Sequence, residues 1–190
     1  IMDIGGGSLE LIILTPGTKG DWEKRWSKSF DAGVSRLAEF GKPSDPLTEA
    51  GAERYAAFLE ETLAAMVEGI QAHEPKHLVG SSGSFDTFVE LVRHAQVTAF
   101  STTPPEKAAN GHPSLQVIDR DGMIAMHSKL LNLDFANRLA LPGMAPARAR
   151  LIPLSSMLVQ VVLAALPPEC DVYQSPYALR EGALHAMIRE

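Results

Sequence analysis

The sequence predicts an α/β domain whose sheet begins with three antiparallel strands. Two observations lead to this fold class. Three short strand-like runs joined by short turns open the chain, and segments with helical periodicity then alternate with further short apolar runs. Helices and strands that alternate in this way pack as layers around one core, and a chain of 190 residues is long enough to bury a sizeable one.

The first three strands are expected to form a meander. Ile1–Ile4 is an apolar run, Gly5–Ser8 is a turn, and Leu9–Leu14 is a second apolar run. A second turn at Thr15–Gly20 leads to a third strand at Trp22–Ser29. Because the connections are short, neighbouring strands are expected to pair in antiparallel fashion.

Two helices, a strand and a third helix are expected next. Gly33–Phe40 has apolar residues at helical spacing, and a threonine stands at the N-cap position of a long amphipathic helix over Glu49–Ala72. His77–Gly80 is a short strand-like run. Ser81–Ser84 is a loop of small residues that enters a helix near Phe85.

The second half of the chain is expected to be mainly helical. In chain order, the remaining predicted elements are a polar loop over 98–114, an extended piece at Gln116–Ile118, helices over Met123–Ala140 and Ala147–Leu166, a strand at Val172–Ser175 and a closing helix over Leu179–Arg189.

The composition argues against two classes of protein. The formal net charge is −6, which is unlike that of a strongly basic nucleic-acid binder, and no apolar run reaches the about 20 residues of a membrane-spanning helix. We therefore expect neither nucleic acid nor membrane as a partner. The single cysteine, Cys170, suits a reducing compartment, and a cytoplasmic location is expected. Ile1 enters directly into a strand-like run, so we also expect a missing segment upstream.

The first candidate site is the glycine-rich hairpin between Asp3 and Glu10. Glycines allow a positive φ and bring backbone N–H groups close to an anion, and Ser8 adds a hydroxyl donor. Asp3 has a carboxylate suited to a divalent cation. The two carboxylates are separated by an odd number of residues, so plain strand alternation would place them on opposite faces unless the glycines break the phase. A solvent-exposed glycine hairpin without a ligand is the alternative.

Two further segments carry polar groups suited to a phosphate. Gly80–Ser84 precedes a helix, where free N–H groups favour an anion, although an ordinary loop before a helix has the same composition. Asp86 is more simply a residue that caps the helix. Arg180 and Glu181 open the closing helix and either reach a cleft or form an exposed ion pair.

Four segments together resemble one protein family. The run Asp3-Ile4-Gly5-Gly6-Gly7-Ser8-Leu9-Glu10 resembles the DIGGGS-T-E segment of the Ppx/GppA phosphatases. Gly33-Val34-Ser35-Arg36-Leu37 resembles their G-V-x-R-L stretch, and Gly80-Ser81-Ser82-Gly83-Ser84 is similar to their G-S/T-x-G-T loop. Leu179-Arg180-Glu181-Gly182 resembles the start of their terminal helix. The four segments occur in family order across the chain.

The resemblance implies an actin-like ATPase fold, which is built from ribonuclease H-like domains. Such a domain has a mixed sheet with helices on both faces. Residues 1–190 would be the second, C-terminal domain of a two-domain phosphatase. The first domain would carry another phosphate loop and the glutamate that activates water, so this chain alone is expected to be inactive.

The resemblance also implies the reaction, which is hydrolysis of a terminal phosphoanhydride in polyphosphate or guanosine pentaphosphate. Asp3 would hold Mg²⁺ or another divalent cation, and Glu10 would orient the water or the metal shell. The expected partners are this substrate, the protein's own N-terminal domain and a second copy in a homodimer. The implied phosphate-binding residues are Gly5, Gly6, Gly7, Ser8, Gly80, Ser81, Ser82, Gly83 and Ser84. Three further cleft residues are considered: Arg36, Arg180 and Glu181.

The sequence departs from the family pattern at three positions. Leu9 stands where the family often has threonine, and Ser84 replaces another threonine. Arg150 stands where the family usually has an acidic residue. It either adds a cation for a polyanionic substrate or is a surface residue of a helix.

Two other functions remain open from the sequence. The first is a sensor that binds polyphosphate or an alarmone without hydrolysing it. The second is another ATPase or kinase of the actin-like fold, such as a sugar kinase, although no adenosine-pocket signature of that group is evident.

Overall fold

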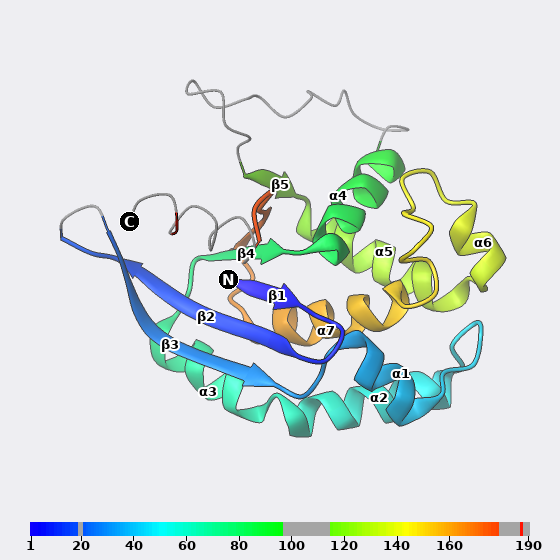
Figure 1. Ribbon diagram of the computed structural model, residues 1–190, viewed down its shortest axis with the longest axis horizontal. Coiled ribbons are helices and arrows are strands. Elements are labelled where there is room, and N and C mark those ends of the chain that lie inside the picture. The colour runs from blue at the N-terminus through cyan, green and yellow to red at the C-terminus, as the bar shows by residue number, and fades with distance from the viewer. Residues whose placement is uncertain (19–20, 97–114, 179–186, 188–190) are drawn as a thin grey trace.

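The computed structural model describes residues 1–18, 21–96, 115–178 and 187, and it contains a six-stranded mixed sheet (Figure 1). The strand order is β3-β2-β1-β4-β6-β5. The strands are β1 (Met2–Ile4), β2 (Leu9–Pro16), β3 (Trp22–Phe30), β4 (His77–Ser81), β5 (Gln116–Ile118) and β6 (Asp171–Gln174).

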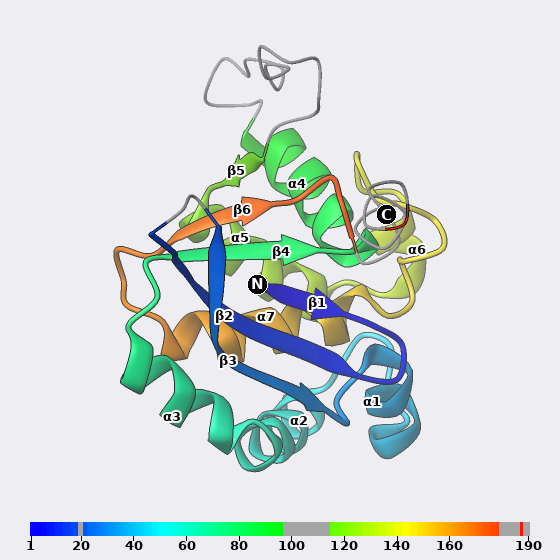
Figure 2. The same cartoon turned by 60° about the vertical axis from the view of Figure 1, so that its left-hand side comes forward.

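The pairing of the strands confirms the predicted meander. β1 pairs antiparallel with β2, and β2 pairs antiparallel with β3. β1 and β6 each pair parallel with β4, and β5 lies antiparallel on β6 at the far edge. Figure 2 shows β1, β4 and β6 pointing toward one edge of the sheet. Loops at the carboxyl ends of parallel strands gather at such an edge, which is where open α/β sheets bind ligands.

The helices agree with the predicted helical segments, with two differences. The helices are α1 (Val34–Gly41), α2 (Glu49–Thr62), α3 (Ala64–His73), α4 (Gly83–Gln96), α5 (Arg120–Asn132), α6 (Phe135–Leu139) and α7 (Ile152–Ala165). The long helix predicted over Glu49–Ala72 is broken at Leu63. The helix predicted over Met123–Ala140 is also split in two, because Asp134 is extended and its side chain accepts a hydrogen bond from Asn137 N–H as the N-cap of α6.

Two more boundaries follow from local signals. Asp119 caps α5 by accepting a hydrogen bond from Gly122 N–H at 2.8 Å, so the helix predicted from Met123 begins earlier, at Arg120. The helix predicted from Ala147 begins only at Ile152, after a series of turns, and Pro153 lies in its first turn, where proline costs no hydrogen bond. The predicted loop over 98–114 and the closing helix lie outside the described residues.

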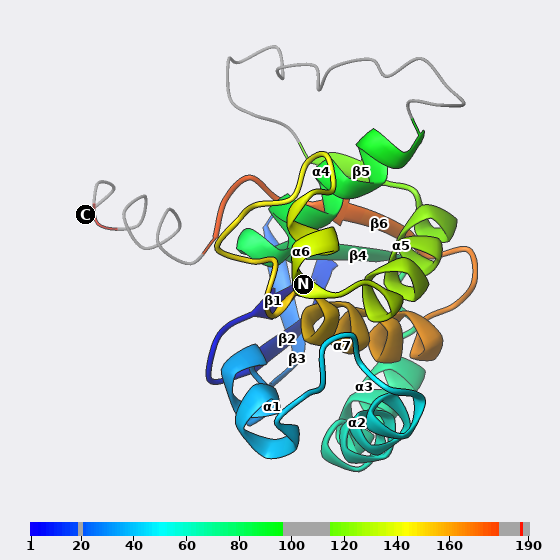
Figure 3. The same ribbon diagram turned by 90° about the vertical axis from the view of Figure 1, so that its right-hand side faces the viewer.

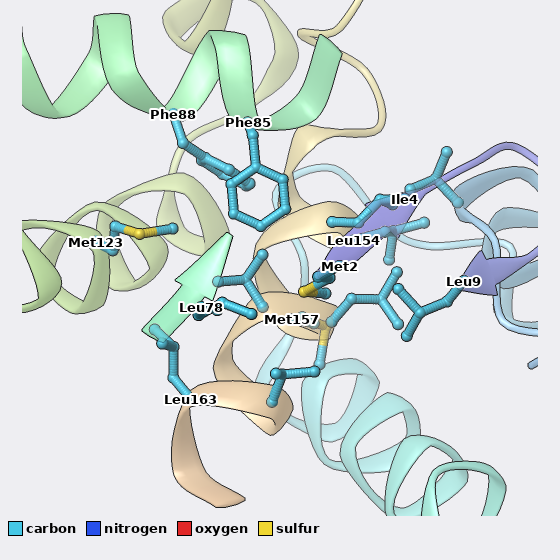
Figure 4. Packing of buried hydrophobic residues seen from close by; sticks show 14 of the residues in the cluster. Met2, Ile4, Leu9, Leu78, Phe85, Phe88, Met123, Leu154, Met157 and Leu163 are labelled. Carbon is cyan, nitrogen blue, oxygen red and sulfur yellow. The ribbon is translucent and has the colours of Figure 1, made fainter. Parts of the chain in front are cut away.

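The core lies between the sheet and the helices that cover it. Figure 3 shows α2, α3, α5 and α7 on one side of the sheet. β2 alternates buried and half-buried residues, as expected of a strand with one face on the core. In contrast, α7 is apolar around most of its surface and is largely buried. Figure 4 shows its Leu154 and Met157 beside Met2 of β1, with Phe85 of α4 approaching the same cluster.

No helix in the described part of the chain is long and apolar enough to cross a membrane.

Candidate functional site

Asp3 and Glu10 lie directly opposite each other on neighbouring strands. The register of the hairpin pairs Asp3 with Glu10, and both side chains are half-buried on the face opposite the core residues Met2 and Leu9. Side chains paired in this way have Cβ atoms about 5 Å apart. Of the two possibilities left open by the sequence, the structure shows the shared face. The four-residue turn Gly5–Ser8 reverses the chain, so residues paired across it are an odd number of positions apart and lie on one face.

A row of four polar residues crosses the sheet at this level. Ser81 of β4 pairs with Asp3, and Ser29 of β3 pairs with Glu10. Paired residues on adjacent strands point to the same face of a sheet. The register therefore brings together two carboxylates and two hydroxyls from four strands, of which β4 is far from the other three in the sequence.

The glycine turn exposes three unpaired backbone amides. Gly5 N–H donates to the carbonyl oxygen of Ser8 at 2.9 Å. The N–H groups of Gly6, Gly7 and Ser8 have no partner in the part of the chain that the structure describes, and Gly6 and Gly7 are exposed. These groups remain available to an anion, as the glycine-rich sequence predicted.

The start of α1 fixes the direction of those amides. Gly33, Val34 and Ser35 donate their N–H groups to the carbonyls of the glycine turn, at distances of 3.3 Å to Gly7, 3.1 Å to Gly5 and 2.9 Å to Gly6, respectively. In a trans peptide the carbonyl and the following N–H point in opposite directions. The amides of Gly6, Gly7 and Ser8 therefore point away from α1.

Close approach, rather than a left-handed backbone, accounts for Gly33 and in part for Gly6, but not for Gly7. None of the three turn glycines has a φ in the left-handed region, so the expected positive φ was wrong. A Cβ added to Gly33 would lie 2.3 Å from the carbonyl oxygen of Gly6, and one added to Gly6 would lie 3.3 Å from Ser35 Oγ. Next to Gly7 there is open space within 4 Å.

The carboxylate of Glu10 is held by two hydroxyl groups. Ser8 O–H donates to Glu10 Oε1 at 2.5 Å, and Ser29 O–H donates to the same oxygen at 2.8 Å. The Ser8 hydroxyl, expected to donate to phosphate, thus donates to Glu10 in this structure. Oε2 of Glu10 has no hydrogen-bond partner in the described part of the chain.

The loop at Gly80–Ser84 lies at the same edge of the sheet as the glycine turn (Figure 2). Ser82 O–H donates to the carbonyl of Ile4 at 3.1 Å, which ties the loop to the end of β1. Ser82 has a φ of 80°, an uncommon value for a residue with a side chain, and the turn leads directly into α4. The amides of Gly83 and Ser84 have no partner within the described residues.

The hydroxyls of this loop do not all face the site. Ser84 is fully buried, and its Oγ lies 3.2 Å from Ser155 Oγ in α7, so its side chain belongs to the core. Ser81 is nearly buried beside Asp3, and its hydroxyl has no partner in the described part of the chain.

Arg148, which no sequence motif singled out, lies against the second loop. A Cβ added to Gly83 would lie 2.4 Å from Arg148 Nη2, so the guanidinium occupies the space beside the first residue of α4. No ion pair or hydrogen bond engages this guanidinium among the described residues. The nearby Arg150, which departs from the family pattern, is placed differently: its guanidinium carbon lies 5.2 Å from the centroid of the Phe135 ring.

Arg150 lines a pocket of about 320 Å³ whose walls contain none of the residues of the two loops. The Arg150 side chain is exposed, and the residue lies in the turns before α7 rather than in a helix. Lys42 and Asp45 also line this pocket, and Asp45 accepts a hydrogen bond from the buried guanidinium of Arg138 at 2.7 Å.

Asp86 connects α4 to the end of β6. Gln174 Nε2 donates to Asp86 Oδ1 at 2.7 Å, and Ser175 N–H donates to the carbonyl of Gly80 at 2.8 Å. Gln174 is buried. Asp86 stands in the first turn of α4, and its carboxylate anchors the start of that helix to a neighbouring strand.

The remaining predicted cleft residues have different outcomes. Arg36 lies in the first turn of α1 and pairs with Asp31 at 3.5 Å on the exposed surface. Arg180 and Glu181 lie outside the described residues.

The donor set around Asp3 fits a magnesium ion. No cluster of three or more His, Cys, Asp or Glu side chains suited to a metal occurs within the described part of the chain. Mg²⁺ is nevertheless commonly held by one or two carboxylates together with waters and substrate phosphates. Asp3 has no hydrogen-bond or ion-pair partner among the described residues, and Glu10 supplies a second carboxylate on the same face.

Comparisons with known proteins place the chain in a family. The chain matches the family model of the Ppx/GppA phosphatase family over residues 1–190. No protein in a search of curated proteins matches.

Solved structures of similar proteins confirm the fold. An exopolyphosphatase from Cytophaga hutchinsonii is 30% identical, with a TM-score of 0.80 over 99% of this chain. The type II variant of an Aquifex aeolicus Ppx/GppA phosphatase is 21% identical, with a TM-score of 0.72 over 97% of this chain. The predicted fold class is therefore confirmed: a mixed sheet with helices on both faces, in the actin-like ATPase fold. This chain covers 56% and 55% of the length of these two proteins, respectively.

Proposed function

This chain belongs to the Ppx/GppA phosphatase family, and from that membership we propose that it supplies one half of a site that hydrolyses terminal phosphoanhydride bonds. The substrate is inorganic polyphosphate or guanosine pentaphosphate. The observation that carries the proposal is the set of three unpaired amides beside two carboxylates at the edge of the sheet. Phosphoryl transfer depends mainly on positioning and charge stabilisation, and groups of these kinds provide both.

The amides of Gly6, Gly7 and Ser8 would bind the terminal phosphate. They are held by a rigid helix start, so little conformational freedom is lost when an anion binds. Donors that are fixed before the substrate arrives stabilise developing charge most effectively.

The loop at Gly80–Ser84 would hold phosphate from the same edge of the sheet. Its contribution comes from the amides of Gly83 and Ser84 and from the N-terminus of α4, rather than from the buried Ser84 hydroxyl. Arg148 adds a guanidinium beside these amides, and arginine binds phosphate through paired N–H donors. The cation also offsets the acidic net charge of the chain.

Asp3 would hold Mg²⁺, and Glu10 would orient the attacking water or the shell of that ion. When bound, the ion neutralises charge on the phosphate oxygens. The fixed Oε1 of Glu10 leaves Oε2 as the atom that accepts a proton or a hydrogen bond from water. Loss of either carboxylate therefore removes an interaction with the reacting groups and not merely a packing contact.

We further propose that the rest of the site lies on a first domain of similar fold. This chain spans little more than half the length of the Cytophaga hutchinsonii exopolyphosphatase, and it is matched over almost its whole length. Residues 1–190 would then form the C-terminal domain, and the partner domain would contribute a second phosphate loop and the catalytic base.

The proposal is tested by phosphate release from polyphosphate and from guanosine pentaphosphate, with Mg²⁺, by the full-length protein. Asp3→Asn and Glu10→Gln are expected to lower the rate about 100-fold or more, because each removes a charge that acts on the reacting groups. Their unfolding transitions should match that of the wild type, since both side chains lie outside the core. Rates equal to the wild type would remove these residues from the mechanism.

Measurements of polyphosphate binding and of phosphate transfer to a sugar, made beside this assay, separate the alternatives. Tight binding of polyphosphate without release of phosphate would identify a sensor. Transfer of phosphate from ATP to a sugar would identify a kinase of the same fold.

A further inference from the structure

We infer that Ser29 is a positioning residue that keeps Glu10 fixed while the hydroxyl of Ser8 turns to the substrate. The inference rests on the proposed function, in which Glu10 acts on the water or the metal shell. Ser29 lies on β3, outside both of the loops that the sequence singled out.

Ser29 and Ser8 share one acceptor. Both hydroxyls donate to Oε1 of Glu10, at 2.8 Å and 2.5 Å. The sheet register places Ser29 of β3 directly beside Glu10 of β2. Ser8 lies in the glycine turn itself, two residues before Glu10. The two donors therefore belong to different parts of the fold, one at the substrate turn and one on a strand behind it.

The chemistry of a hydroxyl group separates their roles. A serine hydroxyl carries one proton, so it donates to one acceptor at a time. The Ser8 hydroxyl belongs to the same residue as one of the three unpaired amides, so a phosphate bound by that turn brings a competing acceptor to it. When Ser8 donates to the phosphate, Glu10 loses that donor.

Ser29 then becomes the remaining donor that orients Glu10. The paired backbone of β2 and β3 holds it at its position whether or not a ligand occupies the turn. With Oε1 fixed by Ser29, Oε2 stays directed to the site throughout the change at Ser8. Without Ser29, either Glu10 loses its orientation or Ser8 stays bound to Glu10 and is lost to the substrate.

The test uses four new variants of the full-length protein, together with the single variant Glu10→Gln, and is run with polyphosphate and Mg²⁺. Ser29→Ala is expected to lower kcat about tenfold, as the loss of one hydrogen bond to a charged group does, with a smaller change in KM. Ser29→Thr keeps the hydroxyl and should restore most of the rate. Ser27→Ala is the matched control. Ser27 lies on β3, as Ser29 does, but it pairs with Ile12 of β2 and not with Glu10, so its substitution should leave kcat unchanged.

The fourth variant combines Ser29→Ala with Glu10→Gln. If Ser29 acts through Glu10, the added change should lower the residual rate of Glu10→Gln by less than about twofold. A full tenfold further loss, or a Ser29→Ala rate equal to that of Ser27→Ala, would overturn the inference. A wild-type protein that releases no phosphate would instead overturn the proposed function, so the two failures are distinguishable.

Discussion

Gly33→Ala is expected to detach the glycine turn from the start of α1. Gly33 is buried, and its φ of −68° is open to any residue, so the backbone conformation itself is not strained by alanine. The difficulty is steric. The new Cβ would lie 2.3 Å from the carbonyl oxygen of Gly6 and 2.4 Å from the carbonyl carbon of Gly7. These are backbone atoms, so relief requires the turn to move away from the helix.

The magnitude follows from what that movement breaks. Four hydrogen bonds, of 2.9 to 3.4 Å, join the start of α1 to the turn, and each contributes about 1 kcal/mol. Overpacking adds about 1–3 kcal/mol, while the lower entropy of the unfolded chain returns about 0.4–1 kcal/mol. Because the turn relaxes in part, we expect Gly33→Ala to lower the free energy of unfolding by about 2–3 kcal/mol.

Urea unfolding followed by far-UV circular dichroism measures this change, and Gly7→Ala is its matched control. No atom lies within 4 Å of a Cβ added to Gly7, and its φ lies outside the left-handed region. Its free energy of unfolding should therefore stay within about 0.5 kcal/mol of the wild type. If Gly33→Ala were as stable as Gly7→Ala, the argument that α1 holds the turn would be refuted.

Three further predictions follow from the same structure. The isolated 190-residue chain should release phosphate at a negligible rate, and robust turnover would show that the catalytic base has been misplaced. Arg148→Ala should raise KM for polyphosphate by about tenfold with little change in the unfolding transition, because it removes charge-assisted hydrogen bonds; an unchanged KM would separate Arg148 from the phosphate. Burial lowers the pKa of His127, whose Nδ1 lies 2.9 Å from Ser156 Oγ. The unfolded chain therefore binds a proton at His127 more readily than the folded protein does. Urea titrations should show the free energy of unfolding falling as the pH drops below about 6.5. His127→Gln should flatten that slope, and an equal slope in the variant would exclude His127 as its cause.

The sequence predicted most of the elements because their signals are local. The hairpin, Gln116–Ile118 and the threonine-capped α2 each rest on residues within one turn or strand. Asp134 also carries a local signal, an N-cap residue ahead of Asn137, and attention to it would have split the helix predicted from Met123.

The site was less predictable because it depends on register. Ser29 meets Glu10 only through the pairing of β2 with β3, and Arg148 meets Gly83 through the packing of the turns before α7 on the start of α4. Neither contact leaves a pattern in the sequence. Ser84 shows the opposite case. Its place in a phosphate-binding motif predicted a ligand, whereas its hydroxyl is buried in the core within hydrogen-bonding distance of Ser155.

The most direct test of the account is a crystal structure of the full-length protein with Mg²⁺ and a non-hydrolysable imidophosphate chain. The terminal phosphate is expected within hydrogen-bonding distance of the amides of Gly6, Gly7 and Ser8, with the metal bound at Asp3. A phosphate chain bound elsewhere, with the glycine turn directed to open solvent, would contradict it.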